Sequence, residues 1–392
     1  MAKAQKQGRS LFFVPMNIVV NTRFLIRDQL EGYGYFTLEV FRVLTRQFPE
    51  HQFYFLFDRD HDPAFVLGAN VHPIKISPPA RHPLLWKFWY EVRVPAVLKK
   101  LKADVFISPD GISSLRTRVP QCLVLHDIGI IHYPQDYKRS HYLFYKRNIP
   151  RMIRKAKSVC TVSNFSKQDI IKTYGTLPEK IDIVYSAAKN IFRPCKREEA
   201  EKTRAEFTGG TEYFIYAGSI HPRKNLLQLL RAFSLFKKRM QSNMKLVLVG
   251  RMLWKNDQFL QSLKTYKYRE DVVITGYVQE AQLVRLMGAA YALVYPSAFE
   301  GFGVPVLEAM KSEVPVLTSQ NSSMQEIAKD AALYFDPADH TDIAESLMRI
   351  YKDEELRRQL IEKGKELESH YSWQRTALLL WESMMKVAGR WD

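Results

Sequence analysis

Short apolar runs alternate with longer amphipathic segments along nearly the whole chain, and this alternation restricts the fold more than any other feature. The pattern is typical of βαβ units, in which a helix connects two parallel strands. Ten runs rich in β-branched and aromatic residues predict strands at residues 10–16, 51–57, 104–108, 121–127, 158–163, 212–218, 245–250, 271–276, 291–297 and 314–319. The sequence therefore predicts an α/β protein built on parallel sheets.

The predicted strands divide five and five around one break in the pattern. Residues 183–202 change from strand character to a proline and a charged run, which predicts a hinge near 187–205. Since 392 residues exceed what one core usually supports, we expect one domain over 1–190 and another over 191–372. The tail, about 373–392, has apolar residues at helical spacing and predicts an amphipathic helix packed on the protein.

Basic residues are concentrated in the first half of the chain. The net charge is +17, and residues 1–200 carry 32 Lys and Arg against 17 Asp and Glu, whereas residues 201–392 carry 26 against 24. A basic half-molecule attracts the phosphates of nucleic acid, anionic lipid or a diphosphate-linked substrate. The alternative is a solvated basic surface without a partner.

Cysteine usage and hydropathy indicate a reducing cytoplasm. Cys122, Cys160 and Cys195 show neither paired spacing nor a CxxC motif, so neither a disulfide framework nor a zinc site is expected. Basic residues precede an apolar run at the start, but Pro15 and Asn17 interrupt that run, which favours a buried strand over a signal peptide. An apolar stretch of about 18 residues, as a membrane span requires, does not occur.

The segment 216–233, YAGSIHPRKNLLQLLRAF, predicts an anion site. A buried strand ends at Gly218, and Arg223 and Lys224 stand where a helix begins. Backbone N–H groups at a helix start, beyond the carboxyl end of a parallel strand, bind anionic ligands. Solvated basic residues at a helix start are the alternative, although helix starts disfavour cations unless an anion is present.

The segment 295–310, YPSAFEGFGVPVLEAM, predicts two carboxylates that face one cleft. Glu300 lies in a glycine-rich loop and Glu308 in a helix that Pro305 opens. Carboxylates suit sugar and ribose hydroxyls because each oxygen accepts hydrogen bonds in fixed directions. Two glutamates at this spacing carry little weight alone, but together with the Arg-Lys loop they form a specific pattern.

The motifs YAGSIHPRKN, LVLVGR, ITGYV and EGFGVPVLE, in this order, resemble the donor half of family-4 (group 1) glycosyltransferases with the GT-B fold. The resemblance covers residues 183–335 strongly and the rest loosely. It implies two Rossmann-like domains whose parallel sheets face each other across a cleft, with the C-terminal helix crossing back to the first domain. It also implies a UDP- or GDP-sugar donor, retention of anomeric configuration, no cofactor and no metal.

The same resemblance implies roles for individual residues. Arg223 and Lys224 would bind the donor diphosphate, Glu300 the transferred sugar and Glu308 the ribose. The other residues expected to contact the donor are Gly218, Gly250, Tyr277, Val278, Gly301, Phe302, Gly303 and Val304.

In the first half, LEGYGYFTLEV resembles the family's glycine loop and would bring Gly32, Tyr33 and Gly34 to the sugar and acceptor, ahead of a helix. The segment LHDIGIIHYP matches the family's strand-end His-Asp, and its His126 would contact the sugar or acceptor. The segment 162–170 also matches the family, but its serines are interpreted as structural, with Ser163 after a strand and Ser166 at a helix start.

Two further segments have open interpretations. FDRDHD spaces Asp58, Asp60 and Asp62 as cation ligands could be spaced, but a polar turn after a strand explains them better. Residues 81–102 mix aromatic and basic side chains, and they predict either an element in a membrane interface or a core-facing helix with a basic outer face.

Together these observations predict a metal-independent hexosyltransferase of mannose or glucose type for cell-surface polysaccharide. Its acceptor would be a glycan or a lipid-linked glycan, and the enzyme would lie at the cytoplasmic face of the membrane, held by anionic lipid. A non-catalytic nucleic-acid-binding protein is the alternative from another class, but the sequence holds no recognised nucleic-acid module. An epimerase or hydrolase of the same fold is the other alternative.

Overall fold

The computed structural model describes residues 14–27, 30, 32–80, 82–252 and 257–390. Its first half forms a seven-stranded sheet in the order β3-β2-β1-β4-β5-β6-β7. All its strand pairs are parallel, as expected when helices connect successive strands. The strands are β1 Asn17–Asn21, β2 Gln52–Phe57, β3 Val71–Lys75, β4 Val105–Ser108, β5 Gln121–Val124, β6 Ser158–Thr161 and β7 Ile181–Ile183.

The second half forms a six-stranded parallel sheet in the order β10-β9-β8-β11-β12-β13. In each sheet the direction of the strand order reverses beside the first strand of the set, β1 or β8. Open α/β sheets bind ligands beyond the carboxyl ends of the strands at such a point. The strands are β8 Tyr213–Ala217, β9 Lys245–Val249, β10 Val272–Gly276, β11 Ala292–Tyr295, β12 Val316–Ser319 and β13 Ala332–Phe335.

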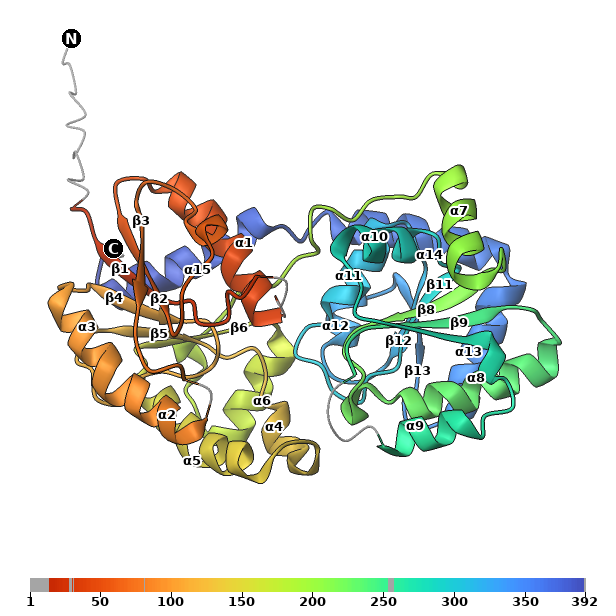
Figure 1. Ribbon diagram of the computed structural model, residues 1–392, viewed down its shortest axis with the longest axis horizontal. Coiled ribbons are helices and arrows are strands. Elements are labelled where there is room, and N and C mark those ends of the chain that lie inside the picture. The colour runs from red at the N-terminus through yellow and green to blue at the C-terminus, as the bar shows by residue number, and fades with distance from the viewer. Residues whose placement is uncertain (1–13, 28–29, 31, 81, 253–256, 391–392) are drawn as a thin grey trace, which may run out of the picture.

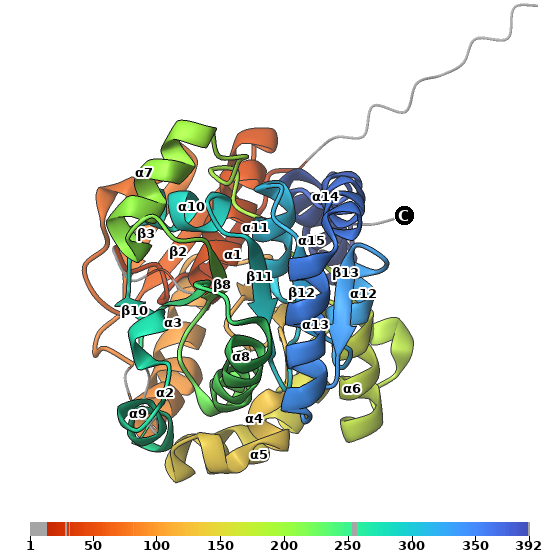
Figure 2. The same cartoon turned by 90° about the vertical axis from the view of Figure 1, so that its right-hand side faces the viewer.

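Helices cover both faces of each sheet, so each half is a three-layer α/β unit (Figure 1). In the second unit, α10 and α11 lie on one side of the sheet and α8 and α9 on the other; Figure 2 shows α8 and α13 side by side. The helices of the first unit are α1 Gly32–Gln47, α2 Pro83–Phe88, the π-helical turn η2 Trp89–Arg93, α3 Val94–Lys100, α4 Gly129–His132, α5 Arg139–Lys155 and α6 Asn164–Tyr174. Those of the second unit are α7 Arg197–Thr208, α8 Leu226–Met240, α9 Asp257–Lys264, α10 Glu280–Gly288, α11 Val304–Lys311, α12 Met324–Ala328, α13 His340–Lys352 and α14 Glu354–Glu368. Short 3₁₀ turns occupy Pro63–Phe65, Pro134–Asp136, Pro178–Lys180, Pro222–Lys224 (η5) and Arg269–Asp271.

The chain passes between the two units twice. Residues 184–196 connect β7 to α7, and the last helix, α15 Trp373–Ala388, returns to pack on the first unit (Figure 1). Its Trp381 ring stacks on Phe48 with ring centroids 3.8 Å apart. The Trp373 indole N–H donates to the carbonyl of Ala188 in the connection, at 3.0 Å. The predicted crossing of the C-terminal helix is therefore confirmed.

The sequence prediction missed three strands and misplaced one. The missed strands β3, β7 and β13 are all edge strands, and edges are short and less apolar because they are paired on one side only. The prediction of a strand at 10–16 is wrong: β1 is Asn17–Asn21, Val14 to Met16 precede it as irregular chain, and residues 10–13 lie outside the described residues.

Residues 83–100 form a continuous helical segment of α2, the π-helical turn η2 and α3. Trp86, Trp89 and Tyr90 are buried in the first unit, whereas Leu84 and Phe88 are exposed. The core-facing interpretation therefore holds for the buried rings, whereas a place in a membrane interface stays a prediction. Arg81 lies outside the described residues.

Cys122 and Cys160 are buried on neighbouring strands with their sulfurs 3.5 Å apart, and all three cysteines are thiols. Among the described residues, none of the helices combines the length and apolar character that crossing a bilayer requires.

Candidate functional site

Two glycines let adjacent strand ends of the second sheet approach closely. Gly218 follows β8 with φ +150° and Gly250 follows β9 with φ +146°, in the region that favours glycine. A Cβ on Gly250 would overlap the carbonyl oxygen of Gly218. These two turns leave room for a ligand above the strand ends, and both were predicted to contact the donor.

A cavity of about 360 Å³ lies above these strand ends, between the two units. The first unit contributes Leu30, Gly32 and Tyr35, and the connection contributes Ser186 and Lys189. The predicted donor residues that line it are Gly218, Gly250, Tyr277, Val278, Val304 and Glu308, and Gly32 of the predicted glycine loop joins them.

Glu308 is the buried carboxylate of this cavity. It lies in α11, which begins after Gly303, a residue with φ +93° that only glycine adopts easily. Burial raises the pKa of Glu308 to about 7, although the nearby Lys189 ammonium acts in the opposite direction. The carboxylate therefore takes up and releases its proton near neutral pH.

A polar cluster at the rim of the cavity was not predicted from the sequence. Lys189 lies 3.0 Å from a carboxylate oxygen of Glu280 and 3.4 Å above the Tyr35 ring, and the Tyr35 hydroxyl donates to the same oxygen of Glu280. The cluster joins α1, the connection and α10. No local motif marks these residues, because the contact between Tyr35 and Glu280 spans 245 positions.

The predicted cations stand at the adjoining ends of β8 and β11. Lys224 is 8% exposed and forms an ion pair with Glu300, which is 7% exposed; its ammonium also donates to the Tyr295 hydroxyl at 2.9 Å. Burial lowers the pKa of Lys224, whereas Lys224 and Arg223 together hold the pKa of Glu300 below its ordinary value despite burial. The guanidinium of Arg223 donates to the carbonyl of Phe299 at 2.7 Å.

Local backbone structure fixes these cations in place. They lie in the 3₁₀ turn η5, which His221 caps by accepting the N–H of Arg223 at 3.2 Å. Asn225 follows in the left-handed region and donates to the carbonyls of Pro296 and Pro337. The cations therefore precede α8, close to where a helix was predicted to start.

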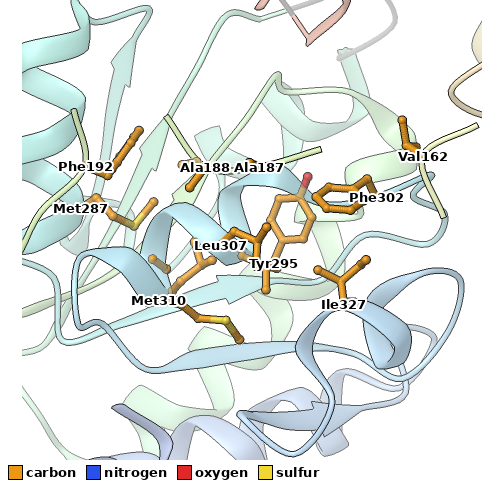
Figure 3. Close-up of a cluster of buried hydrophobic side chains, with 14 of the residues drawn as sticks. Val162, Ala187, Ala188, Phe192, Met287, Tyr295, Phe302, Leu307, Met310 and Ile327 are labelled. Carbon is orange, nitrogen blue, oxygen red and sulfur yellow. The ribbon is translucent and has the colours of Figure 1, made fainter. Parts of the chain in front are cut away.

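Apolar packing supports the loop that carries Glu300. Figure 3 shows Tyr295, Phe302 and Leu307 in one cluster with Ala187 and Ala188 of the connection. Phe302 is 5% exposed and its ring lies 5.9 Å from that of Tyr371. Its side chain therefore packs between the units and does not line the cavity as a donor contact would.

On the first unit, His126 and Tyr33 lie together but are not among the residues that line the cavity. The Nε2 of His126 lies 3.1 Å from the carbonyl of Pro109, and its ring meets Tyr33 at 4.8 Å. Burial lowers the pKa of His126 to about 4, so the imidazole is neutral at pH 7. Gly32 and Gly34 do not precede a helix as predicted but lie in the first turn of α1, where Gly34 packs against the Phe24 carbonyl.

The segment around Ser163 joins the two units. Ser163 caps α6 by accepting the N–H of Ser166, and both hydroxyls donate to the carbonyl of Gly301. The carboxylate of Glu326 in α12 accepts the N–H groups of Asn164 and Phe165. A structural role for both serines therefore agrees with the structure, and it includes holding the Glu300–Gly301 loop.

The three aspartates of FDRDHD face different partners. Asp58 accepts from Arg59 and the Ala80 N–H, Asp60 pairs with Lys75, and Asp62 pairs with Arg27. Over the ranges that the structure describes, no three potential metal ligands of the His, Cys, Asp or Glu type come together.

Chemically, the cleft combines cations at strand ends with buried carboxylates. Arg223 and Lys224 can bind a diphosphate, while Glu308 lies in a neighbouring cavity where it can accept from hydroxyls. These contacts are what a nucleoside diphosphate sugar requires.

Comparison with known proteins identifies the family. The model of glycosyl transferases group 1 matches residues 197–367, and that of Glycosyltransferase Family 4 matches residues 31–188. O-antigen chain mannosyltransferase B of Escherichia coli is 30% identical over 253 residues, covering 64% of this chain and 66% of that protein. O-antigen chain mannosyltransferase RfbU of Salmonella typhimurium is 29% identical over 260 residues, covering 66% and 68%. The matched regions thus span about two thirds of these relatives.

The fold is shared with solved structures. The crystal structure of Anabaena HepE in complex with UDP and glucose superposes with a TM-score of 0.74 at 16% identity, covering 94% of this chain and 99% of that one. With two family models on the two halves and this fold, the chain belongs to the family-4 (group 1) glycosyltransferases and has the GT-B architecture.

Proposed function

We propose that the protein transfers a hexosyl group, mannosyl in the first instance, from a nucleoside diphosphate sugar to a hydroxyl of a glycan or lipid-linked glycan in cell-surface polysaccharide synthesis. The observation that carries the proposal is the placement of Arg223 and Lys224 at the strand ends beside the cavity that holds Glu308. The two mannosyltransferase relatives support the choice of mannose.

In the proposed reaction, the bond between the anomeric carbon and the diphosphate oxygen breaks, and its electron pair stays on the leaving phosphate. The acceptor hydroxyl attacks the same face, its oxygen bonds to the anomeric carbon, and its proton passes to the leaving phosphate oxygen. The configuration is therefore retained. Arg223 and Lys224 supply preorganised positive charge where negative charge develops, which is often the largest catalytic contribution.

We also propose that the reaction needs neither a metal nor a cofactor. Two protein cations offset the diphosphate charge, and the Asp58–Asp62 segment uses its carboxylates on other partners. The base of the donor would lie against Tyr277 and Val278, and both UDP and GDP donors are candidates.

Product analysis tests the proposal. Purified protein is incubated in EDTA with GDP-mannose or UDP-glucose and an oligomannoside, and products are separated by mass spectrometry. A hexose added to the oligomannoside, with release of the nucleoside diphosphate, supports transfer. An epimerised donor would indicate an epimerase, and free hexose with no transfer would indicate a hydrolase. Activity that requires added Mg²⁺ would contradict metal independence.

We further propose that the enzyme binds the anionic surface of the cytoplasmic membrane through α2 and α5. Leu84, Phe88 and Leu143 are 73%, 43% and 52% exposed, and the two helices are joined by Trp86, whose ring lies 5.2 Å from that of Phe144. The exposed basic residues on these helices are Lys87, Arg139, Lys146, Arg147, Arg151, Arg154 and Lys155. Apolar side chains beside basic ones suit an interface with anionic lipid.

Vesicle sedimentation tests this surface. Binding to vesicles that contain phosphatidylglycerol should exceed binding to phosphatidylcholine vesicles, and salt should weaken it. Leu84→Asp should reduce binding, whereas Leu177→Asp, at a 63% exposed leucine between α6 and β7, should not. Equal binding to both vesicles would contradict the proposal, and salt-sensitive binding to DNA instead would favour a nucleic-acid partner.

A further inference from the structure

Asp127 lies between the two units, facing Arg223, although the family's His-Asp match gave a role only to His126. It follows β5, and one carboxylate oxygen, Oδ1, accepts the N–H of Gly129 at 2.8 Å. The other, Oδ2, lies 3.9 Å from the guanidinium of Arg223, with 23% of the side chain exposed. Because 3.9 Å is too long for a hydrogen bond, Oδ2 can still accept a hydrogen bond from a ligand hydroxyl.

Asp127 also contacts the loop that carries Glu300. A Cβ on Gly301 would lie 2.9 Å from the Asp127 Cβ and 3.2 Å from Oδ2, so glycine is needed for the two loops to meet. Gly129 likewise packs against the Phe299 ring. The Asp127 carboxylate is thus fixed between Arg223, the cation predicted to bind the diphosphate, and the loop of Glu300, predicted to hold the transferred sugar.

Among the described residues of the first unit, the side chains that pack around Asp127 are uncharged, so the cation beside it is Arg223 of the second unit. His126 is neutral at pH 7, and Tyr33 packs on it. Tyr137 is also uncharged, since burial raises its pKa to about 12. A phosphate on the side of Asp127 that faces away from Arg223 would be repelled by the carboxylate, whereas a sugar hydroxyl there would donate to it in a charge-assisted hydrogen bond.

We propose that Asp127 binds the attacking hydroxyl of the acceptor, and that the acceptor sugar which enters the reaction centre is neutral and not phosphorylated. This inference rests on the proposed transfer reaction. Asp127 orients the hydroxyl through Oδ2 but does not keep its proton, which passes to the leaving phosphate oxygen as in the proposed reaction. Any phosphate of a lipid-linked acceptor then lies farther from the reaction centre.

Asp127→Asn is the test, because the amide oxygen can still accept the N–H of Gly129. Hydrogen bonds to a charged group contribute enough that kcat/KM for α-methyl mannoside should fall about ten- to a hundredfold. Dissociation constants for GDP and UDP, measured by calorimetry, should stay equal or become smaller, since a carboxylate near Arg223 has been removed. Discrimination against mannose 6-phosphate, relative to α-methyl mannoside, should shrink. Asp169→Asn, which removes the carboxylate paired with His132, should change none of these.

Three outcomes would overturn the inference while the proposed function stands: unchanged kcat/KM in Asp127→Asn, nucleotide binding weakened in parallel with transfer, or a parent enzyme that prefers mannose 6-phosphate. Weaker nucleotide binding in Asp127→Asn would mean that Asp127 acts only by positioning Arg223. If Asp127→Asn does not fold, Asp127→Ser, whose hydroxyl can also accept from Gly129, replaces it. The proposed function itself would be contradicted by a parent enzyme that binds nucleotide but transfers no hexose to α-methyl mannoside, mannose 6-phosphate or an oligomannoside.

Discussion

Replacing Lys224 by methionine should remove one of the two cations from the diphosphate site while keeping most of the buried volume. Loss of one preorganised group that stabilises developing charge typically costs about 10²–10³ in kcat. Lys224 is bonded to Glu300 and Tyr295 and is 8% exposed, so solvent cannot easily replace its charge. We therefore expect kcat to fall at least about a hundredfold at saturating donor.

The same change should also reduce stability, because Glu300 loses its ion-pair partner in a buried position. Breaking a buried ion pair costs about 3–5 kcal/mol. The loss should lie near the lower value because Arg223 still offsets the charge of Glu300. The double variant Lys224→Met/Glu300→Gln separates the two effects: it should regain much of the stability but none of the activity. Transfer is followed by release of GDP or UDP, and stability by urea unfolding. A kcat for Lys224→Met within about threefold of the parent, a barrier change below 1 kcal/mol, would refute the reasoning.

Further results are expected for Glu308, Gly250 and Gly209. Glu308 should accept ribose hydroxyls best when ionised, so donor affinity should rise as pH increases through about 7, whereas Glu308→Gln should raise the donor KM and flatten that profile. Folding raises the pKa of Glu308 from 4.5 to about 7. Its contribution to the free energy of unfolding is therefore fully present below pH 4.5, and about 3 kcal/mol of it is lost as the pH rises from there through 7. The ligand-free parent should thus lose more stability over this range than Glu308→Gln. Gly250→Ala should abolish nucleotide binding because its Cβ overlaps the Gly218 carbonyl, whereas Gly209→Ala, with φ +64° but open space around it, should cost only about 1 kcal/mol of unfolding free energy. A Gly250→Ala protein with parent affinity, or a pH-independent donor KM in the parent, would contradict these expectations.

The sequence was sufficient for the α/β class, the GT-B architecture and the crossing of the last helix, because these depend on periodic apolar patterns and on ordered local motifs. It was less informative about β3, β7 and β13, since edge strands bury one side less and so show a weaker pattern. The shift of β1 has a similar cause: residues 10–20 are apolar almost throughout, so hydropathy alone does not fix where pairing with β2 begins.

Within the site, local motifs singled out Lys224 and Glu300 in short loops and Glu308 in the helix that follows, because glycine or proline stands at fixed spacing near each. Lys189 was missed, and Asp127 was part of the His-Asp match but was given no role, for a different reason. The role of each depends on contacts with residues about 90 or more positions away, Glu280 for Lys189 and Arg223 for Asp127, and hydropathy patterns do not record such contacts. The adjacent His126 and the glycine two residues later were the available indications for Asp127.

A crystal structure with bound GDP or UDP tests the central claim most directly. The diphosphate should lie within hydrogen-bond distance of the Lys224 ammonium and the Arg223 guanidinium, with the ribose hydroxyls on Glu308 and the base against Tyr277. A nucleotide bound elsewhere, or bound here with its ribose away from Glu308 and its diphosphate away from both cations, would contradict the account.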